Sequence, residues 1–148
     1  MRKFDLRNMR RNADRLVGVK IDKLGRAAGV EIAARLIRKT PVDKGVARGN
    51  WNASVGAPDA LWSPTRTDKQ GNATIAKASN TAQRLKFFDG QTFYMTNAVP
   101  YITVLDEGRR MVDGKLQGSI QSPDGMSRPT IREMGPTIKR IGARLRRG

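Results

Sequence analysis

The chain has 148 residues, the usual size of one domain, and its 29 lysines and arginines against 13 aspartates and glutamates give a formal net charge of +16. It contains no cysteine and no histidine, which excludes disulfides, thiolate nucleophiles, Cys-ligated zinc and the commonest general base. Only 38% of the residues are hydrophobic and 5% aromatic, so we expect part of the stability to come from assembly.

The positive charge is concentrated at the two ends of the chain. Residues 1–40 hold 12 basic and 4 acidic residues, and residues 126–148 hold 7 and 1, whereas residues 41–125 hold 10 and 8. This distribution favours contact with a polyanion, either nucleic acid phosphates or an acidic protein surface. The alternative is that long exposed helices carry lysine and arginine for solubility.

Membrane association is not expected. No segment approaches the roughly 20 apolar residues of a membrane helix, and the start of the sequence lacks the apolar core of a signal peptide. No basic segment carries a bulky aromatic face either. We therefore expect the protein in a cytoplasm-like compartment.

Residues 6–39 are predicted to form one long amphipathic helix, because their apolar residues recur in steps of three and four. The stripe comprises Leu6, Met9, Ala13, Leu16, Val17, Ile21, Leu24, Ala28, Ile32 and Leu36. Gly18, Gly25 and Gly29 lie roughly on one side of this helix, where a neighbouring helix or subunit could approach closely; alternatively, they only loosen it. Thr40-Pro41 should end the helix.

The body of the domain is predicted over residues 41–126. After a turn at 41–45, apolar and polar residues alternate over 47–55, which indicates a strand whose buried face is anchored by Trp51 rather than one in which Trp51 stacks on a base. Residues 57–72 are predicted to form a long loop that is functional or mobile, with Trp62 placed to dock on another subunit.

The second half of the chain is predicted to alternate between short elements and turns. We expect a helix over 75–88, a strand over 92–97, a helix over 101–107 ended by Gly108, and a hairpin turning at Asp113-Gly114. Ser127 should cap a C-terminal helix over 127–147 with Pro129 near its first turn, and Pro136 should kink it. The predicted fold is a single α+β domain with a small antiparallel sheet.

No catalytic site is predicted. The most suggestive acidic pair is Asp106 and Glu107, but adjacent side chains on a helix point about 100° apart. A metal-dependent nuclease needs two or three convergent carboxylates, and the segment 45–49 lacks the Lys-Ser/Thr ending of a phosphate-binding loop. We therefore predict no enzyme, no cofactor and no metal.

Three stretches of the sequence carry a resemblance. They are residues 40–51, with a Pro-Val-Asp-x-Gly-like turn running on to tryptophan; residues 90–108; and residues 121–126, which lead into a helix with Thr130 and Glu133. In this order and spacing they resemble the tail-completion or neck protein family of tailed bacteriophages, which includes the lambda-like minor tail protein Z group. The basic segment between Gly108 and Gln121 is longer than that family's pattern, and the resemblance does not cover the tail after Gly135.

The resemblance implies a structural virion protein that forms a six- or twelvefold ring at the head-tail junction and joins the connector to the tail. The implied partners are further copies of the chain, the head connector or adaptor, the tail tube or terminator proteins, and genomic DNA in the lumen. The implied location is the virion neck or tail, with the host cytoplasm during assembly. The alternatives are a sequence-nonspecific nucleic-acid-binding protein of another kind and a small nuclease.

Two sets of candidate residues follow. The candidates for the assembly interface are Pro41, Asp43, Gly45, Trp51, Trp62, Pro100, Tyr101, Glu107, Gly108, Pro123, Gly125 and Met126. The candidates for contact with DNA or an acidic partner are Arg128, Arg132, Lys139, Arg140, Arg144, Arg146 and Arg147. Each member of the first set could instead maintain the fold of the subunit.

Overall fold

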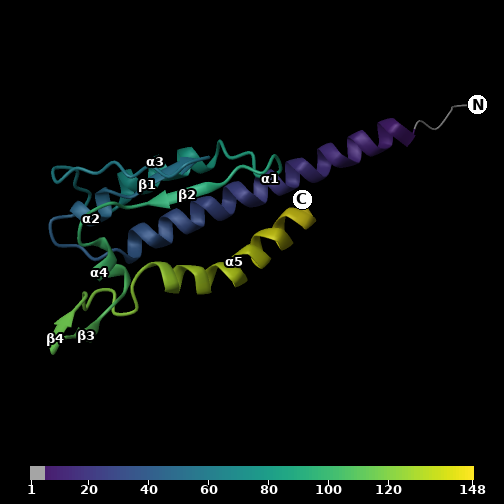
Figure 1. The fold of residues 1–148 in the computed structure, drawn as a ribbon. Helices are drawn as coiled ribbons and strands as arrows, with labels where there is room; N and C mark the ends of the chain where they lie inside the picture. Colours follow the sequence, from purple (N-terminus) through teal and green to yellow (C-terminus); the bar gives the residue numbers. More distant parts are fainter. Residues whose placement is uncertain (1–5) are drawn as a thin grey trace, which may run out of the picture.

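The computed structural model describes residues 6–148, with side chains from residue 11 onward (Figure 1). The helices are α1 (Leu6–Lys39), α2 (Val46–Gly49), α3 (Asn72–Ala82), α4 (Ile102–Asp106) and α5 (Ser127–Arg147). The strands are β1 (Asn52–Val55), β2 (Phe93–Thr96), β3 (Arg110–Val112) and β4 (Lys115–Gln117), and the antiparallel pairs are β1–β2 and β3–β4. The predicted α+β fold is confirmed.

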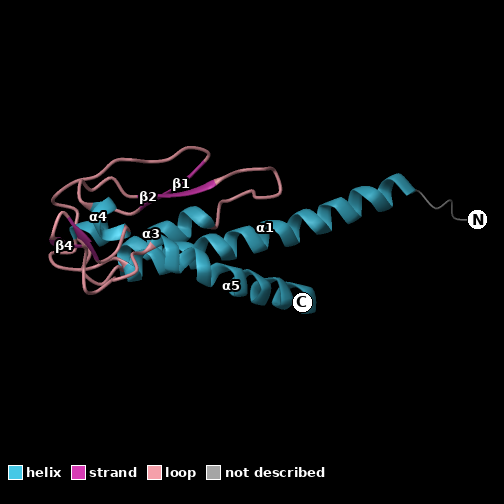
Figure 2. Ribbon diagram, turned by 60° about the horizontal axis from the view of Figure 1, so that its bottom comes forward, coloured by secondary structure: helices cyan, strands magenta, loops and turns pink. Residues whose placement is uncertain are grey.

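Helix α1 is the axis of the molecule. It packs against α5, which runs antiparallel to it, and against α3, which in turn contacts β1 (Figures 1 and 2). The N-terminal part of α1 extends past the other elements, and residues 11–17 on it are exposed. The C-terminal end of α5 points in the same direction as the N-terminal part of α1 but ends short of it (Figure 1).

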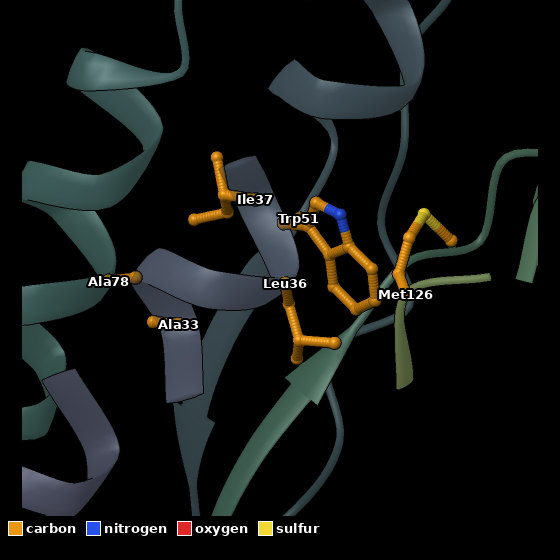
Figure 3. Close-up of a cluster of buried hydrophobic side chains, with 6 residues drawn as sticks. All are labelled: Ala33, Leu36, Ile37, Trp51, Ala78 and Met126. Atoms are coloured by element: carbon orange, nitrogen blue, oxygen red, sulfur yellow. The ribbon is translucent and has the colours of Figure 1, made fainter. Parts of the chain in front are cut away.

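The core joins segments that are distant in the sequence (Figure 3). Its buried side chains are Ala33, Leu36 and Ile37 of α1, Trp51 before β1, Ala78 of α3 and Met126 before α5. Trp51 is only 8% exposed, and its Nε1 donates a hydrogen bond of 2.7 Å to Oγ1 of Thr40. Trp51 is therefore a core residue, as the sequence predicted.

The first half of the strand predicted over 47–55 is wrong. Residues 46–49 form the short helix α2, and β1 begins at Asn52, where it pairs with Thr96 of β2. Gly49 contributed to the alternation that suggested a strand, but it is a glycine for another reason. A Cβ at this position would lie 2.8 Å from the backbone nitrogen of Asp68. Close passage of the 57–72 loop, and not a pleated face, explains the small residue.

The glycine side of α1 is used inside the chain. A Cβ on Gly25 would lie 2.6 Å from Cβ of Phe87, and one on Gly18 would lie 3.0 Å from Cδ1 of Phe88. The predicted close approach is thus correct, and the neighbour is the subunit's own segment. The same contact explains why the helix predicted to reach residue 88 ends at Ala82, since both phenylalanines must turn toward α1.

The hairpin and the C-terminal helix lie where they were predicted, but Ser127 is the first residue of α5 and not its cap, because the cap position is Met126, which makes no side-chain capping hydrogen bond. Asp113 (φ 48°) and Gly114 (φ 72°) both adopt positive φ at the tip of β3–β4, as a two-residue type I′ turn requires. Helix α5 contains Pro136, and its axis changes direction about midway in Figure 1. The missing amide hydrogen of proline accounts for the bend.

An ion-pair cluster fastens α5 to α1. Glu133 accepts a hydrogen bond of 2.7 Å from Nζ of Lys39 and one of 2.6 Å from Nη1 of Arg35. These hydrogen bonds, first that of Lys39 and then that of Arg35, lower the pKa of Glu133. Because the folded pKa lies below the unfolded value, the stabilisation is present above the unfolded pKa and is lost as the pH falls through the folded one.

We expect Glu133→Gln to be less stable than the parent at neutral pH, by about 1 kcal/mol for a partly exposed pair. The difference should shrink as the pH falls through the lowered pKa of Glu133, because the parent carboxyl is then itself protonated. Urea unfolding of both proteins across this pH range measures the effect. A stability difference that stays constant with pH would show that the charge on Glu133 is irrelevant.

Candidate functional site

The stretches that carry the resemblance meet at one place in the structure. The side-chain amide of Gln121 accepts a hydrogen bond of 2.9 Å from the backbone nitrogen of Val42 and donates one of 2.9 Å to its carbonyl. Gln121 thus satisfies both backbone groups of Val42, as a neighbouring strand would. The turn after α1 is thereby fixed to the loop that precedes α5.

The middle stretch is tied to the other two by side chains that bind backbone. Asn97 donates a hydrogen bond of 2.7 Å to the carbonyl of Ala47. One carboxylate oxygen of Asp106 accepts hydrogen bonds from the backbone nitrogens of Met126 (3.0 Å) and Ser127 (2.7 Å). Asp106 therefore caps the start of α5, where a negative charge also complements the helix dipole.

These ties enclose a hollow of about 270 Å³, which we call the junction hollow. Its walls include Pro41, Val42, Asp43, Gly45, Tyr101, Leu105 and Gln121. Four of the predicted interface residues, Pro41, Asp43, Gly45 and Tyr101, are therefore neighbours in space. Tyr101 is exposed at the rim, whereas Leu105 packs against the core.

Three glycines make a second close crossing, which we call the glycine crossing. Gly108, Gly118 and Gly125 all have φ between 78° and 83°, a range that favours glycine. A Cβ on Gly125 would collide with the carbonyl oxygen of Asp106, and one on Gly108 with that of Pro123. Gly118, which the sequence analysis did not single out, lies as close to the carbonyl of Gly108.

The loop 57–72 is held at its base by Asn50. This buried amide donates to the carbonyls of Val46 (2.9 Å), Ser63 (2.9 Å) and Arg66 (3.1 Å) and accepts from the amide of Ser63 (2.8 Å). The loop tip remains exposed, with Leu61 73% and Trp62 40% accessible. Trp62 is thus exposed on a loop with a fixed base, and its docking on another subunit stays a prediction. Sequence reasoning missed Asn50, which looked like a residue on the polar face of a strand.

Asp68 binds the backbone amides at the start of α3. The resemblance implies that Asp43 hydrogen-bonds nearby backbone amides in the 41–45 turn, and this is wrong, because Asp43 is exposed and makes no hydrogen bond with residues 11–148. Asp68 accepts hydrogen bonds from the amides of Gly71 (2.8 Å) and Thr74 (2.9 Å) at the start of α3. Burial alone would raise the pKa of Asp68, but the hydrogen bonds from Thr74 and Gly71 outweigh it and lower the pKa.

The structure divides the predicted interface residues into two groups. The buried members are Pro41, Trp51, Met126 and the glycines Gly45, Gly108 and Gly125, so their contribution to any assembly would be through the shape of the subunit. The exposed members are Asp43, Trp62, Pro100, Tyr101, Glu107 and Pro123. Glu107 forms an ion pair with Arg110.

The predicted basic contacts follow one face of α5. Arg128, Arg132, Lys139 and Arg146 recur at helical spacing opposite the buried residues of the helix, along roughly 27 Å at 1.5 Å per residue. Arg140 differs from these, because it donates a hydrogen bond of 3.3 Å to Thr137. Arg144 and Arg147 are exposed in the last turn.

A basic groove opens where α5 begins. It has a volume of about 740 Å³. Its walls are Glu107, Arg109, Arg110, Pro123, Asp124, Arg128, Ile131 and Arg132. The hairpin and the first turns of α5 form its two sides, and the glycine crossing holds them together.

The carboxylates weighed for a nuclease have separate structural partners, since Asp106 caps α5 and Glu107 pairs with Arg110. Among the described residues, no three side chains of a metal-binding type lie close enough to hold an ion. Within that same part of the chain, no helix combines the length and apolar content needed to cross a membrane. Comparison with known proteins finds no family model, curated protein or solved structure that matches the chain.

Proposed function

We propose that the chain is a structural subunit of a ring at the head-tail junction of a tailed bacteriophage. The observation that carries the proposal is the junction hollow, where the stretches that resemble the neck family meet although they are up to 79 residues apart. Their polar side chains bind backbone, and their glycines permit close crossings. Such residues set the shape of a subunit.

The charge of the subunit supports an assembly with other components. A ring of identical subunits, each with a net charge of +16, would repel itself unless negative charge lay nearby. DNA in the lumen or an acidic neighbouring ring would supply it. The basic face of α5 points away from the core and is available for such contacts.

The mass of the purified protein, alone and mixed with the connector and tail proteins encoded beside it, tests the proposal. We expect a discrete six- or twelvefold ring, seen by light scattering and electron microscopy. A chain that stays monomeric with those partners at micromolar concentration would contradict it.

The double variant Leu61→Ser/Trp62→Ser tests whether the loop tip takes part in assembly. Leu61 is 73% and Trp62 40% exposed, so the variant should lose about 1–3 kcal/mol of unfolding free energy, less than a core substitution of a tryptophan. We expect the ring to dissociate at a higher protein concentration than the parent ring does. Lys77→Ser, an exposed change on α3, is the control and should leave the mass unchanged.

The row of basic residues along α5 favours one alternative, a sequence-nonspecific nucleic-acid-binding protein. In that case the monomer should bind duplex DNA with an affinity that falls steeply with salt. The quadruple change of Arg128, Arg132, Lys139 and Arg146 to glutamine should abolish that binding. A ring with little affinity for free DNA would favour the first proposal.

A further inference from the structure

The basic groove at the start of α5 contains more positive charge than the chain itself neutralises. Arg110 is paired with Glu107, and Asp124 is the other acidic residue in the walls. The side chains of Arg109, Arg128 and Arg132 make no hydrogen bond or ion pair with any described residue. The groove therefore offers three free guanidinium groups to an anionic ligand.

The groove also contains an apolar side chain that is exposed to solvent among the arginines. Ile131 is 72% exposed, yet it lies one helical turn from Arg128, adjacent to Arg132, and opposite the hairpin. Pro123 adds further apolar surface to the wall. A phosphate backbone would leave Ile131 in contact with water or charge, whereas a protein segment can cover it.

All four cations in the groove are arginines. Arginine is enriched in protein interfaces, and its planar guanidinium pairs with carboxylates through two parallel hydrogen bonds. Because arginine also pairs with phosphates, it is the exposed apolar surface of Ile131 and Pro123 that favours a protein segment over a nucleic acid here.

We propose that this groove binds an acidic protein segment that places an apolar side chain against Ile131 and carboxylates against Arg109, Arg128 and Arg132. A second copy of the chain is a poor occupant, because a subunit of net charge +16 would bring further cations to the groove. The inference rests on the proposed function only for the source of the segment, which would be a neighbouring component of the junction.

Fluorescence anisotropy with labelled synthetic peptides tests the proposal on the full chain. The probe is a short peptide of aspartate and glutamate with two leucines; the comparison probes are the same peptide with serine for leucine, and a short DNA duplex. We expect the leucine-containing peptide to bind about 10-fold more tightly than the serine peptide, as burial of one large apolar side chain implies.

Matched variants locate the binding. Ile131→Ser should weaken the leucine peptide about 10-fold, whereas Ile120→Ser, which changes the same residue type at 71% exposure outside the groove, should not. Arg109→Gln/Arg128→Gln/Arg132→Gln should abolish binding. Arg144→Gln/Arg146→Gln/Arg147→Gln removes the same charge from the far end of α5 and should leave most of the peptide binding intact.

The proposal would be overturned if both peptides bound equally, or if the two triple variants lost binding equally. It would also be overturned if the duplex bound more tightly and Ile131→Ser had no effect. So would no binding of the leucine peptide at about millimolar concentration. The ring mass of the same variants is measured separately. A groove variant that loses the peptide but keeps its ring mass supports both proposals, whereas peptide binding by a chain that never forms a ring speaks against the proposed function alone.

Discussion

Replacing Trp51 with alanine is expected to lower the free energy of unfolding by about 3–5 kcal/mol, the usual cost of removing a large aromatic side chain from a core. Trp51 contacts buried residues contributed by α1 and by the segment before α5, so its loss opens a cavity where distant parts of the chain meet. Urea unfolding followed by circular dichroism measures the change.

The conservative variant Trp51→Phe separates packing from hydrogen bonding. Phenylalanine keeps much of the apolar volume but cannot donate to Oγ1 of Thr40. That hydroxyl still donates to the carbonyl of Leu36 at 2.7 Å, so it keeps a partner, and we expect a loss of only about 1–2 kcal/mol. A Trp51→Ala protein as stable as the phenylalanine variant would show that the core does not depend on this side chain. If the core does depend on Trp51, then assembly defects of Trp51 variants reflect unfolding of the subunit and not the loss of a contact between subunits.

The elements with a strong period or a distinctive turn were predictable from the sequence. The apolar stripe and the Thr40-Pro41 stop define α1, and Ser127 with Pro129 defines the start of α5. Asp113-Gly114 locates the β3–β4 hairpin because few residue pairs adopt positive φ so readily.

Elements that depend on a tertiary neighbour were not predictable. Gly49 looked like part of an alternating strand because the sequence does not show that another backbone passes beside it. The predicted helix over 75–88 kept its period as far as Phe88, but contact with α1 near Gly25 decides the path of the chain there. In both cases the contact partner lies too far along the sequence for a local pattern to reveal it.

The candidate site shows the same division. Its turn residues, such as Gly108 and Gly125, carry a local signature, because glycine is required where φ is positive. Its polar side chains that bind backbone carry no local signature, because Gln121, which binds the backbone of Val42 from 79 residues away, looks in the sequence like any surface glutamine. The three stretches lie far apart in the sequence, and only the structure brings them together.

Replacing Gly125 with alanine is expected to have a comparably large effect, a loss of more than about 3 kcal/mol of unfolding free energy. Two causes add together. Alanine at φ 78° has the intrinsic cost of the left-handed region, and its Cβ would also collide with the carbonyl oxygen of Asp106. Moving Asp106 away would then remove the cap that it provides for the first turn of α5.

Gly56→Ala is the matched control for this prediction. Gly56 has a φ of 88°, but a Cβ there would meet nothing within 4 Å, so its substitution measures the conformational cost alone, about 1–2 kcal/mol. Chemical denaturation of both variants gives the difference, which is the cost of forcing the glycine crossing apart. Equal losses would mean that the two segments separate freely. Because the same crossing holds the hairpin arginines opposite those of α5, Gly125→Ala should also lose the acidic peptide under conditions where Gly56→Ala still binds it.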